Sequence, residues 1–459
     1  MFDSHVLSMP RFAGGGRVDA GLTHEGVMAL APDAKVAAAG MKLGVPRSWD
    51  SPGRSAEALW GECRGSAVYQ VRVGLSDFAV KCSCPSRKHP CKHGIGLLFL
   101  AIEIPLPPAT PPDWVADWLA RRAASTAAKK VTGERGESAP DPEAKEKRAQ
   151  KRLSRVASGL DALDLWMEDL VREGLAAAGT KPAAFWETQA KRMVDAQAPG
   201  VAARVRALSG LPNSSPDWPE KLVAGLGRLA LLAEAFRRLD TLDEPLAESV
   251  RTEVGIPLSQ EEVLERGEKV VDRWIVLGQR TEDEGRLKVR RTWLLGEDTG
   301  RYALILQFAA AGATFSEGFV SGTVAGAELA FYPGASPVRA VARSREGGVT
   351  RVQNLQGYET MEAFLDHTSL ATAGQPWLER LPAVLRDVVP LLEDERDKGR
   401  WLVRDRDGGA LPLAGGEHWT LLSFSGGGPV DLAAEWDGET LLPLGIVTGG
   451  TYRIVHGGG

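Results

Sequence analysis

Cysteine and histidine are scarce in this chain, which has four cysteines and seven histidines among its 459 residues. Long apolar runs are also missing. A membrane-spanning helix needs about 18 consecutive apolar residues, and no run in this sequence approaches that length. The N-terminus has no basic segment followed by an apolar run, so we expect no secretory signal. Few cysteines, most of them beside a histidine, argue for metal binding in a reducing compartment rather than for disulfides. We therefore expect a cytoplasmic protein without a membrane segment.

Common catalytic motifs are missing as well. The sequence has no G-x-x-x-x-G-K-[ST] phosphate loop, no H-E-x-x-H metalloprotease motif and no G-x-S-x-G nucleophile motif. The isolated pairs Asp366-His367 and Glu417-His418 fit structural roles better than catalysis. We expect a protein that is not an enzyme, with an unrecognised catalytic site in the C-terminal half as an alternative.

Most of the cysteines lie in one segment, C-S-C-P-S-R-K-H-P-C-K-H, which contains Cys82, Cys84, Cys91 and His93. Zn2+ prefers four nitrogen and sulfur ligands in tetrahedral geometry, and a shell closed by four protein ligands is typical of structural sites. The C-x-C and C-x-H spacings bring two ligands to one ion from each side. The segment therefore predicts one structural zinc ion.

Nearby residues offer alternative ligands and a charged surround. His89 is interpreted as a solvated loop histidine and Cys63 as a packed, inert cysteine. Three thiolates and one Zn2+ leave about one net negative charge, which neighbouring cations offset. These cations, which are candidate contacts for a protein partner or nucleic acid, are Lys81, Arg87, Lys88 and Lys92.

The segment resembles the SWIM zinc finger family, whose pattern is C-x-C, a variable gap and C-x-H. The resemblance covers about residues 46–103 and implies that Cys82, Cys84, Cys91 and His93 are zinc ligands. The residues shared with bacterial members are Trp60, Gly61, Glu62, Cys63, Gly65, Ser66, Tyr69, the run 82–88 and the run 90–93. A helical segment like residues 190–198 also occurs in the bacterial group, which extends the resemblance beyond the finger.

The resemblance also implies the kind of partner, because family members bind DNA or proteins. Bacterial relatives of this size lack a helicase and tend to be encoded near MoxR-type ATPases and von Willebrand A domain proteins. We therefore expect a zinc-binding, non-enzymatic adaptor for protein–protein or nucleic-acid interaction, within a bacterial ATPase-associated complex. The alternative is a DNA-binding protein that acts in DNA transactions through a basic finger and linker.

Charge is distributed unevenly along the chain. Residues 1–155 carry 23 Lys and Arg against 16 Asp and Glu, whereas the remainder carries 32 against 44. Residues 121–155 hold 11 of these cations and five acids, so this stretch could follow phosphates without sequence preference. Such asymmetry suggests that the two parts face different partners, although simple solvation explains it equally well.

Composition and periodicity predict an α+β fold with several domains: a small ββα zinc finger, a central helical bundle and a β-rich C-terminal region with a few helices. The expected regions are 1–45 (N-terminal segment), 46–103 (finger), 104–152 (proline-rich, charged linker with a short helix), 153–260 (bundle) and 261–459 (β-rich region). Residues 123–150 have almost no large apolar side chains, so this part of the linker is not expected to fold alone.

Within these regions the pattern predicts individual elements. The finger is expected to have strands at 67–73 and 78–81 and a helix at 94–103. The linker helix is expected at 113–122, with Trp114 and Trp118 on one face. Bundle helices are expected at about 183–195, 198–208 and 219–238. In the C-terminal region we expect a helix at 377–393 and a strand at 418–424.

Overall fold

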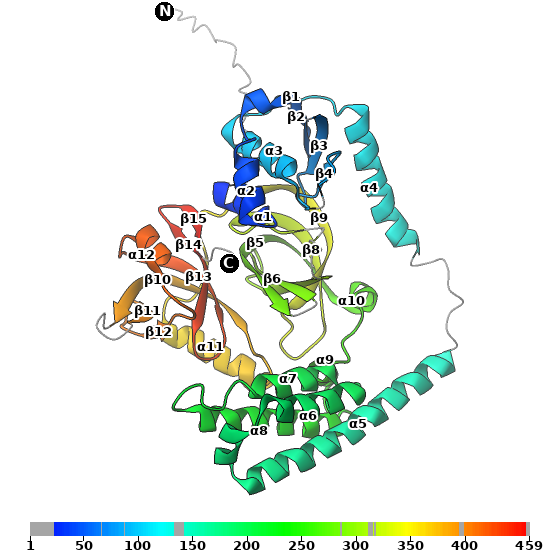
Figure 1. The fold of residues 1–459 in the computed structure, drawn as a ribbon, viewed down its shortest axis with the longest axis vertical. Helices are drawn as coiled ribbons and strands as arrows, with labels where there is room; N and C mark the ends of the chain where they lie inside the picture. Colours follow the sequence, from blue (N-terminus) through cyan, green and yellow to red (C-terminus); the bar gives the residue numbers. More distant parts are fainter. Residues whose placement is uncertain are drawn as a thin grey trace, which may run out of the picture.

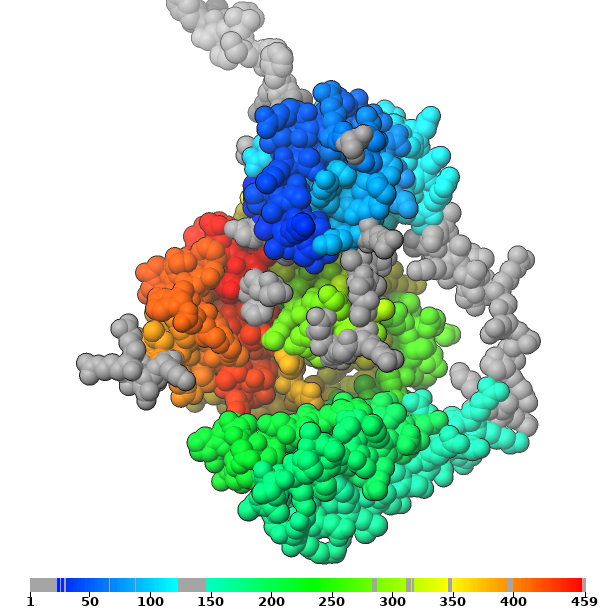
Figure 2. All heavy atoms as spheres, viewed as in Figure 1, coloured from blue at the N-terminus to red at the C-terminus, as the bar shows by residue number. Residues whose placement is uncertain are grey.

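The computed structural model describes residues 23–459, apart from 66, 87, 133–141, 285–286, 311–314, 316–317, 394–398 and 456–459. Four bodies follow one another along the chain: an N-terminal unit, a helical bundle, a β-barrel and a C-terminal sheet (Figure 1). The N-terminal unit and the bundle lie at opposite ends of the molecule, with the other two bodies between them (Figure 2). This arrangement confirms the α+β class. Every helix in the described part of the chain is too short or too polar to cross a membrane.

The N-terminal unit is built on an antiparallel sheet in the order β1-β2-β3-β4. Its strands are β1 (Trp49–Arg54), β2 (Ala58–Arg64), β3 (Val68–Gly74) and β4 (Val80–Cys82). Helix α3 (Lys92–Glu103) covers one face, and α1 (His24–Leu30) and α2 (Ala34–Met41) pack against α3. The expected ββα unit is therefore extended by β1 and β2. Sequence reasoning missed them because β2 is buried almost throughout and shows no polar alternation, and Pro52-Gly53 interrupts β1.

Helix α4 (Asp113–Thr132) packs on the opposite face of this sheet, through Trp114 and Trp118 (Figure 1). Both rings lie over the Arg72 guanidinium, at 5.3 and 5.9 Å, and burial lowers the pKa of Arg72. The prediction that this helix ends near residue 122 was too short. The predicted unfolded stretch 123–150 is helical up to Thr132 and again from Pro142, where α5 begins.

The bundle contains the long helix α5, which extends beyond the other helices (Figure 1). Its helices are α5 (Pro142–Glu173), α6 (Ala183–Asp195), α7 (Pro199–Leu208), α8 (Trp218–Arg237) and α9 (Glu244–Val254). The apolar period of α5 faces the core through Leu160, Leu163 and Leu170, whereas Val171 is exposed. The three helices expected at 183–195, 198–208 and 219–238 are confirmed as α6, α7 and α8.

A short helix, α10 (Gln260–Arg266), leads into the closed barrel. Its strands are β5 (Glu268–Glu284), β6 (Leu287–Gly296), β7 (Tyr302–Ala310), β8 (Thr323–Phe331) and β9 (Arg339–Arg351). They are ordered β5-β6-β7-β9-β8, with β8 pairing back to β5 and with β7 and β9 parallel. The long strand β5 serves both β8 and β6 because its register shifts between Val276 and Gly278. A Cβ on Gly278 would lie 2.6 Å from Cβ of Leu444 in the C-terminal sheet, so glycine permits this close approach.

The C-terminal sheet has the order β12-β11-β10-β13-β14-β15 and carries helices α11 (Met361–Gly374) and α12 (Trp419–Ser425). Its strands are β10 (Leu381–Glu393), β11 (Arg400–Arg404), β12 (Ala410–Pro412), β13 (Val430–Trp436), β14 (Leu441–Thr448) and β15 (Thr451–Ile454). Barrel and sheet share a core that includes Trp293 and Leu444. The two bodies therefore pack face to face rather than acting as separate modules.

Two elements of this region were predicted wrongly. Residues 377–393 were expected as a helix, but 381–393 form strand β10. Their apolar residues occur at both helical and strand spacings, while Pro382 and Pro390 would each remove a hydrogen bond inside a helix. Residues 418–424 were expected as a strand, but Trp419–Ser425 form helix α12. In both cases a short apolar run fits either period.

The bodies are joined by shared apolar cores. Val27 of α1, together with Phe319 and Val320 just before β8, belongs to one core that is continuous from the N-terminal unit into the barrel. At the other end, Trp377 from the α11–β10 connection lies in the bundle core and donates its indole N–H to the Arg228 carbonyl at 3.0 Å. Arg204 of α7 reinforces this contact through an ion pair with Glu379 at 2.7 Å.

Candidate metal centre

The candidate metal centre lies where β4 ends and α3 begins. Cys82 is the last residue of β4 and pairs with Val71, and Cys84 follows in the next loop. Cys91 is the N-cap residue of α3, and His93 lies in its first turn. One atom of each of these four side chains, three Sγ atoms and a ring nitrogen, lies within 4.8 Å of the others. The fold therefore brings together all four residues that the sequence predicts.

The centre is partly buried, and the packing around it restricts its side chains. Cys91 and His93 are buried, at 2% and 6% exposure, whereas Cys82 and Cys84 are partly exposed. Nδ1 of His93 lies 3.7 Å from Sγ of Cys82 and 4.0 Å from Sγ of Cys91. Nδ1 is therefore the imidazole nitrogen that faces the thiols. Glycine at position 94 lets helix α3 lie this close to the sheet. Any other residue would place a Cβ 2.3 Å from a methyl carbon of Val80, which is too close.

An aromatic side chain supports the histidine. Tyr69 of β3 stacks on the His93 ring, with 4.7 Å between centroids and 27° between planes. Tyr69 is among the residues that carry the family resemblance, but the sequence gives no sign of this contact. Because the stacked ring restricts rotation of the imidazole, Tyr69 orients Nδ1 toward the sulfur atoms.

The thiols share protons unequally. A hydrogen bond from Cys82 holds the pKa of Cys91 well below its usual range, and the same bond raises the pKa of Cys82. Burial raises the pKa of Cys84. The cluster thus holds a thiolate at the helix N-terminus, where the helix dipole favours negative charge. Thiolates and a neutral imidazole are the ligands that Zn2+ prefers, so the residues fit this ion.

The two alternative ligands lie apart from the centre. Neither His89 nor Cys63 belongs to the group of converging ligand atoms. Cys63 of β2 is fully buried in the apolar core, and this burial raises the pKa of its thiol to about 11. A neutral thiol in an apolar core neither attacks nor binds metal readily, which agrees with the interpretation of Cys63 as inert.

The predicted cationic surround is less uniform than the sequence suggests. Lys81 and Lys92 are exposed and have no ion-pair partner among the described residues. Lys88 forms an ion pair with Asp33, the N-cap residue of α2 in the same unit. Arg87 lies outside the described residues. Among the three of these cations that the structure describes, Lys81 and Lys92 are therefore the two without an ion-pair partner.

Comparisons with known proteins agree with this geometry. The model of the SWIM zinc finger matches residues 69–102, and the model of the SWIM-associated four-helix bundle domain matches residues 151–254. A search of curated proteins and a search of solved structures each found no match. The first match contains the four converging residues, and the second covers α5 from Lys151 through α9. The chain carries a SWIM zinc finger, with Cys82, Cys84, Cys91 and His93 positioned to bind a zinc ion, followed by a SWIM-associated four-helix bundle.

Proposed function

We propose that the protein is a non-enzymatic adaptor, in which Cys82, Cys84, Cys91 and His93 hold one structural zinc ion and the N-terminal unit binds a protein partner. The observation that carries this proposal is the convergence of four protein ligands within 4.8 Å at the start of α3. Four protein ligands leave no open position for a substrate or an activated water, which is the pattern of structural zinc.

A protein partner is favoured over nucleic acid at this unit. Both faces of its sheet are already covered, by α3 on one side and α4 on the other. Of the three predicted cations that lie in the described part of the chain, Lys88 is ion-paired with Asp33 within the unit, which reduces the positive charge available to phosphates. A MoxR-type ATPase or a von Willebrand A domain protein is the partner that the family resemblance implies.

The zinc assignment is tested by matched cysteine variants. Cys84→Ser removes a thiolate from the cluster and is expected to abolish zinc binding, because a three-ligand site holds the ion far more weakly. Cys63→Ala removes the fourth cysteine of the chain, which lies outside the cluster, and is expected to keep one zinc ion per chain. Elemental analysis of protein purified under reducing conditions gives the metal content. Equal zinc in both variants would contradict the assignment.

The partner is tested by co-purification from the native host with the same pair of variants. The wild-type chain and Cys63→Ala are expected to recover a MoxR-type ATPase or a von Willebrand A domain protein, whereas Cys84→Ser is not. Charge-removing changes at Lys81 and Lys92 are expected to have little effect on a protein contact. Recovery that is independent of Cys84, or recovery of nucleic acid alone, would count against the adaptor role.

A further inference from the structure

The long helix α5 consists of two parts of opposite charge. Residues 146–155, the basic part, carry five cations and one acid, whereas residues 161–173, the acidic part, carry five acids and one cation. The cations of the basic part are Lys147, Arg148, Lys151, Arg152 and Arg155. The acids of the acidic part are Asp161, Asp164, Glu168, Asp169 and Glu173. One continuous helix therefore carries an excess of four positive charges at one end and four negative charges at the other.

The start of the basic part has no buried face. Residues 146–151 are all exposed, where α5 extends beyond the other helices of the bundle (Figure 1). Like charges are spaced four residues apart, at Lys147, Lys151 and Arg155, and this spacing destabilises an isolated helix. A helix that is polar on all sides needs support from favourable ion pairs or from another surface. The helical state of this stretch therefore favours a negatively charged surface against it.

Most cations of the basic part are available for such a contact. Those that form no ion pair with any side chain described in the structure are Lys147, Arg148, Lys151 and Arg155. Arg152 differs, because it donates a hydrogen bond to the carbonyl of Gly255 at the end of α9, 2.9 Å away. The bundle thus holds one cation of the basic part and leaves the others to solvent or to a partner.

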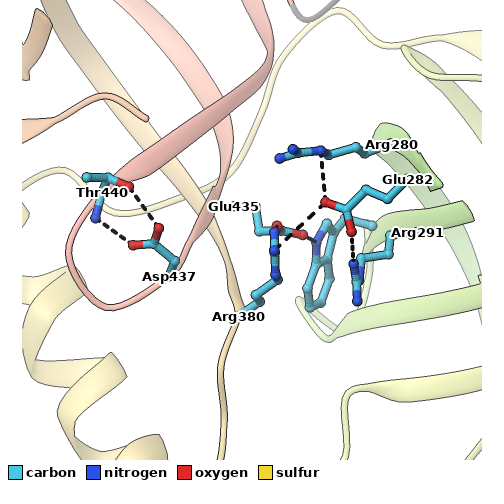
Figure 3. Close-up of polar contacts among 8 residues, drawn as sticks. Arg280, Glu282, Arg291, Arg380, Glu435, Asp437 and Thr440 are labelled. Atoms are coloured by element: carbon cyan, nitrogen blue, oxygen red, sulfur yellow. Dashed lines mark hydrogen bonds and ion pairs between the residues drawn. The ribbon is translucent and has the colours of Figure 1, made fainter. Parts of the chain in front are cut away.

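Arginines at the junction of the barrel and the C-terminal sheet show the pairing that these cations lack (Figure 3). Glu282 pairs with Arg280 at 3.1 Å and with Arg291 at 2.5 Å. Arg380 pairs with Glu435 of β13. At this junction the charges are matched within the chain, whereas the basic part of α5 has no such match among the described residues.

The acidic part has more carboxylates than nearby cations. Glu168 and Asp169 share one guanidinium group, that of Arg172, at 2.8 and 3.3 Å. These two carboxylate side chains are 55% and 78% exposed. Asp161 likewise shares Arg237 of α8 with a second carboxylate. Each guanidinium group thus serves two carboxylates, so the acidic part keeps an excess of negative charge at an exposed surface.

A second copy of α5, antiparallel to the first, would match these charges. With a two-fold axis near Ser158, Lys147 of one copy lies opposite Asp169 of the other, because both residues are eleven positions from Ser158. Eleven residues make about three helical turns, so Lys147, Ser158 and Asp169 share one face of α5. All three are exposed. The symmetry repeats the contact, so the basic part of each copy meets the acidic part of the other.

The centre of this face suits close packing of two helices. Ser154, Ser158 and Ala162 recur every four residues, and all are small and exposed. Leu165 is 62% exposed, although it lies among acids. In the two-fold arrangement Leu165 lies opposite Lys151 of the other copy, since both are seven positions from Ser158. The aliphatic stem of the lysine can cover the leucine while its ammonium group reaches the acids one turn away.

We propose that α5 is a self-association surface, through which two copies of this protein pair antiparallel about Ser158. The overlap from Lys147 to Asp169 is about 33 Å long. A contact made by one charged helix from each copy is small, so the dimer is reversible and its affinity falls as salt rises. A nucleic acid would use the basic part but leave the acidic part and Leu165 without a contact. This surface is separate from the zinc centre and does not depend on the adaptor role proposed above.

The proposal is tested by sedimentation equilibrium of the full-length chain, treated with nuclease, at low and high salt. The wild type is expected to dimerise at low salt and to dissociate at high salt. Lys147→Glu with Lys151→Glu is expected to weaken the dimer about tenfold or more, because each repulsive contact occurs twice. Glu168→Lys with Asp169→Lys is expected to do the same. An equimolar mixture of these two variants is expected to restore the dimer, because opposite charges then face each other again.

The matched control is Lys35→Glu with Lys42→Glu, which makes the same change in net charge at exposed lysines of the N-terminal unit. This control is expected to dimerise as the wild type does. A wild type that stays monomeric at low salt would overturn the proposal, and so would two charge-reversed variants that do not associate when mixed. Association that disappears on nuclease treatment would assign the basic part to nucleic acid and would also overturn it.

The position of the two-fold axis is tested by cross-linking. Ser158→Cys places a thiol at the axis, so a short bis-maleimide is expected to join two copies at low salt. Ser369→Cys on α11, which is also exposed, is expected to give no more covalent dimer than the wild type, whose native cysteines set the background. Equal yields of covalent dimer from the two variants would show that the copies do not meet at Ser158.

Discussion

At the scale of single residues, the zinc centre depends on ligands that are close in sequence. Cys82, Cys84, Cys91 and His93 could be predicted because ligand chemistry and short spacing suffice to bring them together. Their supporting contacts could not be predicted in this way. The Tyr69 stack links β3 to α3, and the Lys88–Asp33 pair links residues 55 positions apart, so both depend on tertiary packing.

The stacked tyrosine is expected to matter for metal affinity. Tyr69→Leu removes the ring that restrains His93. We expect it to weaken zinc affinity roughly tenfold, which is the smaller of the losses that follow removal of a side chain supporting a metal ligand. Tyr69→Phe keeps the ring and is expected to bind as the wild type does. Competition with a chromophoric chelator measures both affinities. Equal affinities for the Leu and Phe variants would show that the stack does not position the imidazole.

At the scale of elements, the regular helices of the bundle could be predicted, whereas several strands could not. Helices α6, α7 and α8 show a clear apolar period, which a single packed face produces. Strand β10 lies between two other strands in the C-terminal sheet and is buried over much of its length, so it has no polar alternation that separates it from a helix. Strand pairings such as β7 with β9 join distant segments, and no local pattern specifies them.

The glycine at the bend of β5 is expected to be required for packing of the barrel on the C-terminal sheet. Gly278→Ala places a Cβ 2.6 Å from Leu444 Cβ, so strand or sheet must shift, at a cost of about 1–3 kcal/mol in the free energy of unfolding. The control is Gly227→Ala. Gly227 lies in the interior of helix α8, and a Cβ placed on it would have no other atom within 4 Å. Because alanine favours a helix more than glycine does, this change is expected to raise the free energy of unfolding by up to about 1 kcal/mol.

Thermal unfolding followed by circular dichroism compares the two variants. We expect the unfolding temperature to fall for Gly278→Ala and to stay level or rise for Gly227→Ala. A Gly278→Ala protein as stable as the wild type would mean that the barrel and the C-terminal sheet can separate at this contact without cost.

At the scale of the whole molecule, the zinc centre is built into a larger core. The apolar core of the N-terminal unit continues into the barrel through Val27, Phe319 and Val320. Among the described residues, the bundle shares no such core with the N-terminal unit, and it lies at the far end of the molecule (Figure 2). Loss of zinc is therefore expected to act on two of the four bodies.

Chelation of zinc is expected to loosen the N-terminal unit and the adjoining end of the barrel, but not the bundle. Metal binding and folding are coupled in small zinc modules, so removal of the ion weakens the packing of α3 on its sheet. Hydrogen exchange measured by mass spectrometry should show faster exchange in residues 58–103 and around 319–329, with α6–α8 unchanged. Faster exchange throughout the bundle, or none around 319–329, would disagree with the shared core.

The indole of Trp377 has a consequence for how fragments of this protein behave. The SWIM-associated bundle match ends at residue 254, yet the core of that bundle is completed by a side chain more than a hundred positions later in the sequence. A fragment cut at the limits of the match would lose this buried indole and its hydrogen bond to the Arg228 carbonyl. The matched region is therefore shorter than the unit that forms the bundle core. We expect a fragment that folds by itself to include the α11–β10 connection.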